Sequence, residues 1–210
     1  LEASPNMNYN WNLVYNFNKE LITNYDNLPT SNANKIDGDY YIQTEVQYAN
    51  GNVYTGELKN GIMHGKGKLI YANKTSYREG NFINGELEGK GKTQYDDGDI
   101  YEGEFLKGER HGYGEYKYND GGYYNGEWKN GKKHGKGKRF WANDKCVYDG
   151  EWVENMEHGS AYLECPSHKY EGMFENGMKN GKGKITAPDG TIHEGYYKDN
   201  EYIPEKVDNN

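Results

Sequence analysis

A glycine-aromatic phrase recurs along this chain about every 23 residues, and this period constrains the fold more than any other feature. The central glycines of the phrase are 24, 23, 23, 24, 22 and 23 residues apart. The phrase begins at Tyr54, Arg78, Tyr101, Tyr124, Tyr148, Tyr170 and His193. A second phrase, related to His-Gly-Lys-Gly, follows the first at residues 64–67 and 134–137, among other places. Self-similarity at this length is typical of a stacked array, in which each repeat contacts its neighbours.

The chain is poor in aliphatic residues but rich in aromatic ones. Of its 210 residues only 33% are hydrophobic, and the mean hydropathy is -1.20. Low hydrophobicity is typical of disordered chains. However, the chain has 22 Tyr and 4 Trp residues, and aromatic side chains bury a large area each. We therefore predict an open array that aromatic contacts between neighbouring repeats stabilise.

Each repeat contains two short stretches in which side chains alternate between two faces. In the first stretch Tyr54, Gly56 and Leu58 share one face, called the aromatic face below. Such alternation indicates β-strands, and the dipeptide Asn60-Gly61 between the two stretches is favoured in tight hairpin turns. The predicted fold class is all-β: an elongated, single-layer antiparallel sheet of repeated β-hairpins, with aromatic rings lying on a floor of glycines.

These phrases resemble the MORN repeat (membrane occupation and recognition nexus). The pattern of that family, Tyr-x-Gly-Glu-Trp followed by Gly-x-x-His-Gly-x-Gly, is met nearly in full from Tyr124 to Gly137. One departure is Arg78, which replaces the first aromatic residue; Tyr77, one place earlier, predicts a bulge there. The resemblance implies association with cytoskeletal or membrane structures.

The resemblance covers residues 54–200 as seven repeats, the last of them truncated. We predict a partial capping repeat in residues 37–53 and a C-terminal tail in residues 201–210. Residues 1–36 lie outside the repeats, and apolar side chains at helical spacing predict an amphipathic helix at about residues 13–27. The apolar positions are Val14, Phe17, Leu21, Ile22, Tyr25 and Leu28. We expect this helix to lie on the aromatic face, as a native cap or a tethered partner; a frayed surface tail is the alternative.

Net charge disfavours some classes of partner, and the cysteines bear on the cellular compartment. The net charge of -8 and the pI of about 5.3 disfavour nucleic acid, which requires a basic footprint. No apolar run is long enough to cross a membrane. Cys146 and Cys165 occupy different positions in their repeats, and we interpret them as reduced thiols of a cytoplasmic protein, with a disulfide as the alternative.

The sequence shows no catalytic or ligand-binding constellation. The Gly-Lys phrases at residues 61–66 and 131–136 are one residue shorter than a phosphate-binding loop and lack its Ser or Thr. Four histidines recur at the same repeat position, which places neighbouring ones about 10 Å or more from each other, too far to share a metal ion. They are His64, His111, His134 and His158. We therefore predict a non-enzymatic chain with no cofactor and no metal site.

The aromatic face is the leading candidate for a binding site. A single-layer sheet cannot bury both of its faces by itself, and exposed apolar patches usually mark interaction sites. We predict a continuous exposed groove lined by Tyr101, Phe105, Tyr124, Trp128, Tyr148, Trp152, Tyr170 and Phe174. This groove should bind a helical or extended segment of a protein partner. The alternative is that the rings only pack on neighbouring repeats and glycines.

The opposite face, called the lysine face, offers a second candidate. It carries Lys66, Lys68, Lys90, Lys92, Lys136, Lys138, Lys182 and Lys184. One interpretation is weak binding of anionic lipid, such as phosphoinositide head groups. Cross-strand ion pairs with Glu57, Glu127 and Glu171 are the favoured alternative. A further hypothesis is a homodimer or larger homo-oligomer joined through open sheet edges.

Overall fold

The computed structural model describes residues 34–36 and 38–204, and these residues form strands and turns without a helix. The strands belong to one open antiparallel sheet and follow one another in chain order. The prediction of an all-β sheet of hairpins is therefore confirmed. The predicted N-terminal helix lies outside the described residues, with its apolar positions Val14, Phe17, Leu21, Ile22 and Leu28.

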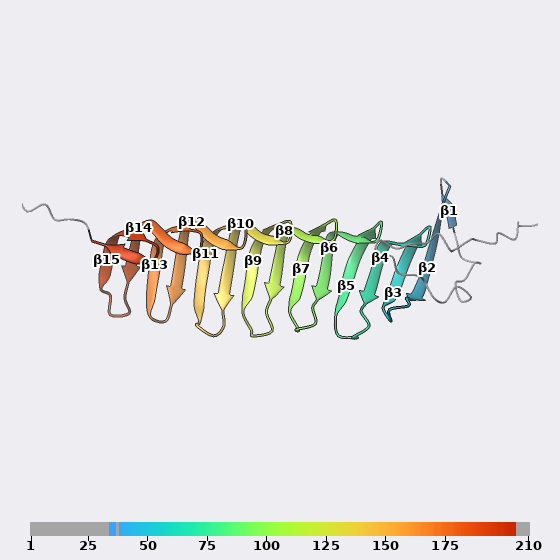
Figure 1. The fold of residues 1–210 in the computed structure, drawn as a ribbon, viewed down its shortest axis with the longest axis horizontal. Coiled ribbons are helices and arrows are strands. Elements are labelled where there is room, and N and C mark those ends of the chain that lie inside the picture. The colour runs from blue at the N-terminus through green and yellow to red at the C-terminus, as the bar shows by residue number, and fades with distance from the viewer. Residues whose placement is uncertain (1–33, 37, 205–210) are drawn as a thin grey trace, which may run out of the picture. The chain divides into compact units, whose positions relative to one another are not determined.

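The described residues fall into two compact units that divide between Glu88 and Gly89. The first unit contains β1 (Asn34–Ile36), β2 (Asp39–Gln47), β3 (Val53–Lys59), β4 (Ile62–Ile70), β5 (Tyr77–Ile83) and the start of β6 (Glu86–Gln94). The second contains the rest of β6, then β7 (Ile100–Leu106), β8 (Glu109–Lys117), β9 (Tyr123–Lys129), β10 (Lys132–Trp141), β11 (Cys146–Val153), β12 (Met156–Cys165), β13 (His168–Glu175), β14 (Met178–Thr186), β15 (Ile192–Lys198) and β16 (Glu201–Ile203). Figure 1 shows the hairpins of the second unit, coloured from green to red, side by side in chain order.

Two-residue turns with positive φ angles join the strands of each hairpin. Asn130 and Gly131 have φ angles of 50° and 75°, as the right-handed twist of a hairpin requires. Glu154 and Asn155 adopt the same geometry in a turn that lacks glycine, with φ angles of 52° and 74°. Several turns are also tied to the preceding repeat by a backbone hydrogen bond; Gly131 N, for example, donates to the carbonyl oxygen of Arg110 at 2.9 Å.

A β-bulge interrupts the hairpins of the repeats. In the pair β9–β10 the register shifts between Lys133 and Gly137. Within the bulge Gly135 has a φ of +58°, and a Cβ on it would lie 2.6 Å from Cδ of Glu127. The Glu127 carboxylate in turn accepts a hydrogen bond of 2.8 Å from the backbone N–H of Lys136. The glutamate of the first phrase and the glycine of the second are therefore complementary parts of one bulge.

The first tyrosine of the repeat lies on the predicted glycine floor. Tyr124 is fully buried, and a Cβ on Gly137 would lie 2.5 Å from its Cζ atom. The phenol donates a hydrogen bond of 2.9 Å to the carbonyl oxygen of Glu127. Equivalent bonds are made by Tyr54, Tyr101, Tyr148 and Tyr170. Burial raises the pKa of Tyr170 to about 12, so the phenol stays neutral and able to donate.

Arg78 takes the place of a first tyrosine without the bulge that the sequence predicted. The register of β4 with β5 runs without a shift to the pair of Ile70 with Tyr77. The prediction was wrong because Tyr77 belongs to the opposite face, where Lys68 Nζ lies 4.1 Å from the centroid of its ring. This cation–π contact gives the tyrosine a partner in the regular register.

Candidate functional site

The rings predicted to line an exposed groove are buried. Their exposed fractions are 0% for Tyr101, Tyr124, Tyr148 and Tyr170, 1% for Trp152, 4% for Trp128, 5% for Phe105 and 6% for Phe174. The prediction of exposed ring edges at these positions is therefore wrong. A partner that approaches the aromatic face meets the side chains that cover these rings.

The rings are buried because each repeat encloses the rings of its neighbour. The Trp128 centroid lies 5.1 Å from that of Tyr124 in its own repeat and 5.3 Å from that of Tyr101 in the preceding one. Both contacts are edge-to-face, the arrangement that aromatic pairs prefer. The indole Nε1 of Trp128 donates to the carbonyl oxygen of Gly114 at 3.1 Å. The rings therefore pack on neighbouring repeats and on glycines, which was the alternative interpretation of the sequence.

Basic side chains cover the buried rings in the second unit. The guanidinium carbon of Arg110 lies 4.4 Å from the ring centroid of Trp128, and Lys133 Nζ lies 4.4 Å from that of Trp152. Both distances are within the range of cation–π contacts. Arg110 also donates a hydrogen bond of 2.7 Å from Nη2 to the carbonyl oxygen of Gly131. The accessible part of the aromatic face is therefore polar and basic at these repeats.

Sequence reasoning missed Arg110 and Lys133 as site residues. Each stands immediately before the His-Gly of its second phrase, where the first unit has Met63 and Leu87. The change from apolar to basic residues at one repeat position was the available signal. Only the structure shows that this position points onto the rings, because the bulge sets the direction of its side chain.

Arg139 lies on the same face and is the most enclosed cation of the second unit. Its side chain is 7% exposed, and its guanidinium carbon lies 3.6 Å from the ring centroid of Tyr118 and 5.5 Å from that of Trp141. Its Nη1 atom is buried and has no hydrogen-bond partner among the residues that the structure describes. Tyr118 and Trp141 are only half-buried, so they form accessible aromatic walls beside the guanidinium.

Arg110, Lys133 and Arg139 are called the cation cluster. Burial, with Arg139 nearby, lowers the pKa of Lys133 to about 8, and burial also lowers the pKa of Arg139. Burial raises the pKa of Glu157, a carboxyl group on the same face of β12. Within residues 34–36 and 38–204 no cation of the cluster lies within ion-pair distance of a carboxylate. Its positive charge is therefore not neutralised by direct contact.

Ion pairs neutralise half of the lysine face. The pairs are Lys68–Glu79 at 3.0 Å, Lys92–Glu102 at 3.4 Å, Lys138–Asp149 at 3.5 Å and Lys184–Glu171 at 3.3 Å. Only the pair with Glu171 has the predicted partner. The predicted partners Glu57 and Glu127 instead lie over the bulge glycines Gly65 and Gly135. Lys66, Lys90, Lys136 and Lys182 form no ion pair with another described residue.

Six stretches of the chain match the MORN repeat family, and together they span more than half of it: residues 54–76, 79–100, 101–123, 124–145, 148–168 and 170–192. The chain belongs to the MORN repeat family. The seventh predicted repeat is not among the matched stretches, although β15 and β16 pair as a short hairpin at its position. MORN proteins are generally non-enzymatic and often mediate protein or membrane interactions.

Other known proteins add little to this assignment. No curated protein matches the chain. One similar solved structure is the G-box domain of the microcephaly protein CPAP, which is 11% identical and has a TM-score of 0.37. The similarity covers 79% of this chain and 98% of that domain, and at this score it supports no argument about the MORN array. Within its described part, the array has no helix long and apolar enough to cross a membrane.

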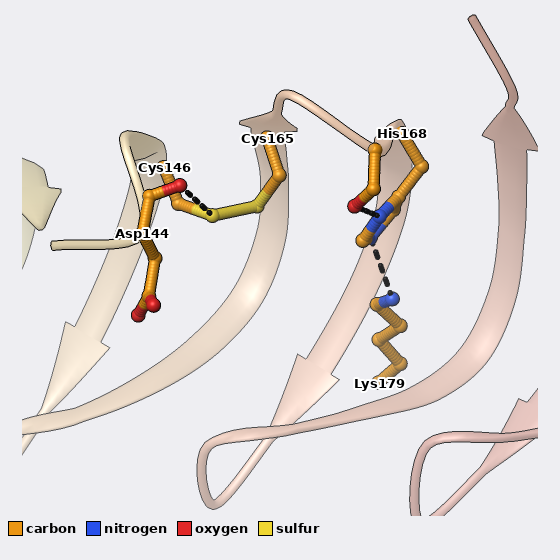
Figure 2. The surroundings of a disulfide bond; sticks show 6 residues. Asp144, Cys146, Cys165, His168 and Lys179 are labelled. Carbon is orange, nitrogen blue, oxygen red and sulfur yellow. Dashed lines mark hydrogen bonds between the residues drawn. A yellow bond between two sulfur atoms is a disulfide. The ribbon is translucent and has the colours of Figure 1, made fainter.

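The two cysteines of the MORN array form a disulfide, with an S–S distance of 2.08 Å (Figure 2). The prediction of reduced thiols was therefore wrong. Cys146 begins β11 and Cys165 ends β12, and antiparallel pairing of these strands brings their ends together. Different repeat positions concealed this proximity in the sequence. Reduced thiols would have indicated a reducing compartment. The disulfide removes that argument, since disulfide bonds persist in oxidising compartments.

The repeated histidines have a structural place beside the bulge. The carbonyl oxygens of His64 and His158 accept hydrogen bonds from the phenols of Tyr54 and Tyr148, at 3.1 and 3.2 Å. In the part of the chain that the structure describes, no three His, Cys, Asp or Glu side chains are grouped so as to hold a metal ion. The role that the structure shows for His64 and His158 is therefore to accept these phenol hydrogen bonds through their backbone carbonyls.

Proposed function

We propose that this MORN array is a non-enzymatic scaffold that binds a helical or extended segment of a protein partner on its aromatic face. The observation that carries the proposal is the composition of the accessible surface there, which includes the half-buried rings of Tyr95, Tyr118 and Trp141 and the half-buried cations Arg110 and Lys133. Tyr, Trp and Arg are the residues that dominate binding hot spots. The eight buried rings are the platform beneath this surface.

A photo-crosslinking amino acid in place of Tyr118 tests the scaffold proposal. The matched control replaces Asn125, an exposed residue of β9 whose backbone neighbours Tyr124 and Gly126 face the opposite way. In native lysate we expect specific protein adducts from position 118 and not from position 125. Equal capture from both positions would show that the aromatic face is not the binding surface.

A second candidate function is membrane targeting through the lysine face. It is favoured by one observation, the absence of ion pairs at Lys66, Lys90, Lys136 and Lys182 among the described residues. Binding to phosphatidylcholine vesicles that contain phosphoinositide should then fall steeply with salt and with Lys136→Gln/Lys182→Gln. Vesicle binding that these changes leave intact would exclude the lysine face.

We also propose a setting at cytoskeletal or membrane structures, in keeping with the family. A cytoplasmic location predicts that Cys146 and Cys165 are reduced in cells, and an oxidising compartment predicts that they are bonded. Thiol alkylation before lysis distinguishes the two.

A homodimer is a further proposal, since exposed Tyr202 and Ile203 lie on β16, and sedimentation velocity over a concentration series tests it.

A further inference from the structure

The fold does not require the cation cluster. At the repeat position of Arg139 the chain elsewhere has Leu69, Leu163 and Ile185. At the position of Lys133 the first unit has the buried residues Met63 and Leu87, whereas the second unit also has Arg110, Glu157 and Lys179. Apolar residues thus fill these positions in the same architecture. A buried cation costs free energy that an apolar side chain does not, so the cluster needs an explanation other than stability.

Ring contacts connect the cations across two repeats. The Arg110 guanidinium carbon lies 5.1 Å from the centroid of Tyr116, and the rings of Tyr116 and Tyr118 are 4.6 Å apart. Tyr118 in turn lies under Arg139 at 3.6 Å. When a guanidinium stacks on an aromatic ring, its flat face is covered by the ring. The N–H groups lie at its edge, where a ligand can accept hydrogen bonds from them.

Two of the carboxylates nearest the cluster accept backbone hydrogen bonds. Asp99 accepts a hydrogen bond of 2.8 Å from Asn119 N, and Asp120 accepts one of 2.7 Å from Gly122 N. Glu157 faces Lys133, and its negative charge opposes the lowering of the Lys133 pKa by burial. These groups lower the net positive potential but leave Arg139 Nη1 without a hydrogen-bond partner in the described chain.

We propose that the cation cluster binds a carboxylate side chain, Asp or Glu, in an acidic segment of the protein partner. The inference rests on the proposed scaffold function and names the chemistry of its partner. The half-buried cations Arg110 and Lys133 can donate hydrogen bonds to such a carboxylate, and the buried Arg139, whose Nη1 atom has no partner among the described residues, adds positive charge beneath it. Apolar residues that flank the acid pack on the half-buried rings of Tyr118 and Trp141. The segment is thereby complementary to the face in charge and in apolar surface.

Peptide selection on the intact chain tests this inference. A displayed library of random 12-residue peptides is selected against the wild-type chain, and the enriched peptides are synthesised with a fluorescent label. We expect them to share an Asp or Glu next to an aromatic or aliphatic residue. Affinity should fall about tenfold or more on Arg139→Leu, on Lys133→Met, and on replacement of the acid by its amide.

The matched control is Lys136→Met, the same substitution on the same strand but on the lysine face. It should leave the affinity unchanged. Melting temperatures check the folding of each variant, and if Arg139→Leu unfolds, Lys133→Met decides alone, since the chain has a methionine at the equivalent Met63.

The outcomes separate the inference from the scaffold function. Enriched peptides that bind equally well as their amide versions would overturn the acidic recognition and leave the scaffold intact. Selection of no peptide would overturn both. Binding of phosphoinositide vesicles that Arg139→Leu abolishes, without any peptide, would assign the cluster to membranes and also overturn the inference.

Discussion

The indole Nε1 of Trp152 donates a hydrogen bond of 2.9 Å to the carbonyl oxygen of Gly137 in the preceding repeat. The same ring lies edge-to-face with Tyr148 of its own repeat at 5.0 Å and with Tyr124 of the preceding one at 5.3 Å. One side chain therefore joins two repeats by a hydrogen bond and by two ring contacts. Stability of this kind is a sum of nearest-neighbour terms, as in other repeat proteins.

Removal of the Trp152 ring should lower the stability of two neighbouring repeats at once. Trp152→Ala deletes a side chain that is 1% exposed, and large-to-small changes of buried aromatic residues cost roughly 3–5 kcal/mol. Trp152→Phe keeps an aromatic ring, as Phe174 does one repeat later, and should cost less: about 1 kcal/mol for the lost hydrogen bond and a further amount for the smaller cavity. Urea unfolding followed by circular dichroism measures both. An unchanged midpoint for Trp152→Ala would contradict the nearest-neighbour account.

The bulge predicts a coupling between Glu127 and Gly135. Gly135→Ala places a Cβ against the Glu127 carboxyl group at a φ of +58°, a region that costs a residue with a Cβ roughly 1–3 kcal/mol. In the Glu127→Ala background the steric part should disappear, so the same change should cost less by at least about 0.5 kcal/mol. A double-mutant cycle from urea midpoints gives the difference. Additive effects would mean that the carboxyl group does not lie over the glycine in solution.

Local signals explain why the hairpins were predictable. One signal is the alternation of side chains between two faces, as in Tyr54, Gly56 and Leu58, and the other is the turn dipeptide Asn60-Gly61. Each depends on a few consecutive residues only, and the structure has both the strand and the turn. The glycine floor also followed, since a buried ring needs a neighbour without a Cβ. The burial of the rings could not be predicted from these local signals, because it depends on how the next repeat packs against the rings.

The features that sequence reasoning missed depend on register between strands. Cys146 and Cys165 meet only because β11 and β12 run antiparallel from a short turn. Arg139 reads as one more polar residue of a charged chain until its cross-strand partners Tyr124 and Tyr148 place it on the aromatic face. The spacing along one repeat can give the face of Arg139, but not the rings of neighbouring strands that enclose it.

Reduction of the disulfide should destabilise the second unit. The bond closes a loop between residues 19 apart in sequence, and for loops of this length cross-linking is worth roughly 3 kcal/mol in the chain-entropy account. Thiol reductant should therefore lower the urea midpoint of the wild-type chain. The Cys146→Ser/Cys165→Ser variant is the control and should unfold at that lower midpoint with or without reductant. A wild-type midpoint that reductant does not move would contradict a stabilising disulfide between these cysteines.

The lowered pKa of Lys133 predicts a dependence of stability on pH. The charged groups that face it are Arg110 on β8, Arg139 on β10 and Glu157 on β12. In the folded chain its pKa is about 8, whereas an unfolded lysine has a pKa of about 10.4. Between these values the unfolded state binds more protons, so the free energy of unfolding rises with pH. Below pH 8 Lys133 is protonated in both the folded and the unfolded chain, so the free energy that its buried charge costs no longer changes with pH.

Lys133→Met removes this cost and isolates it from other titrations. The variant should be more stable than the wild type at pH 7, and its advantage should shrink as the pH rises from 8 to 9.5. The measurement stops there because burial raises the pKa of Tyr124, so that ionisation of unfolded tyrosines lowers stability at higher pH. Urea midpoints of both chains across this range give the difference. A constant difference would mean that Lys133 titrates normally, and that the cations over the aromatic rings are solvated in the free protein.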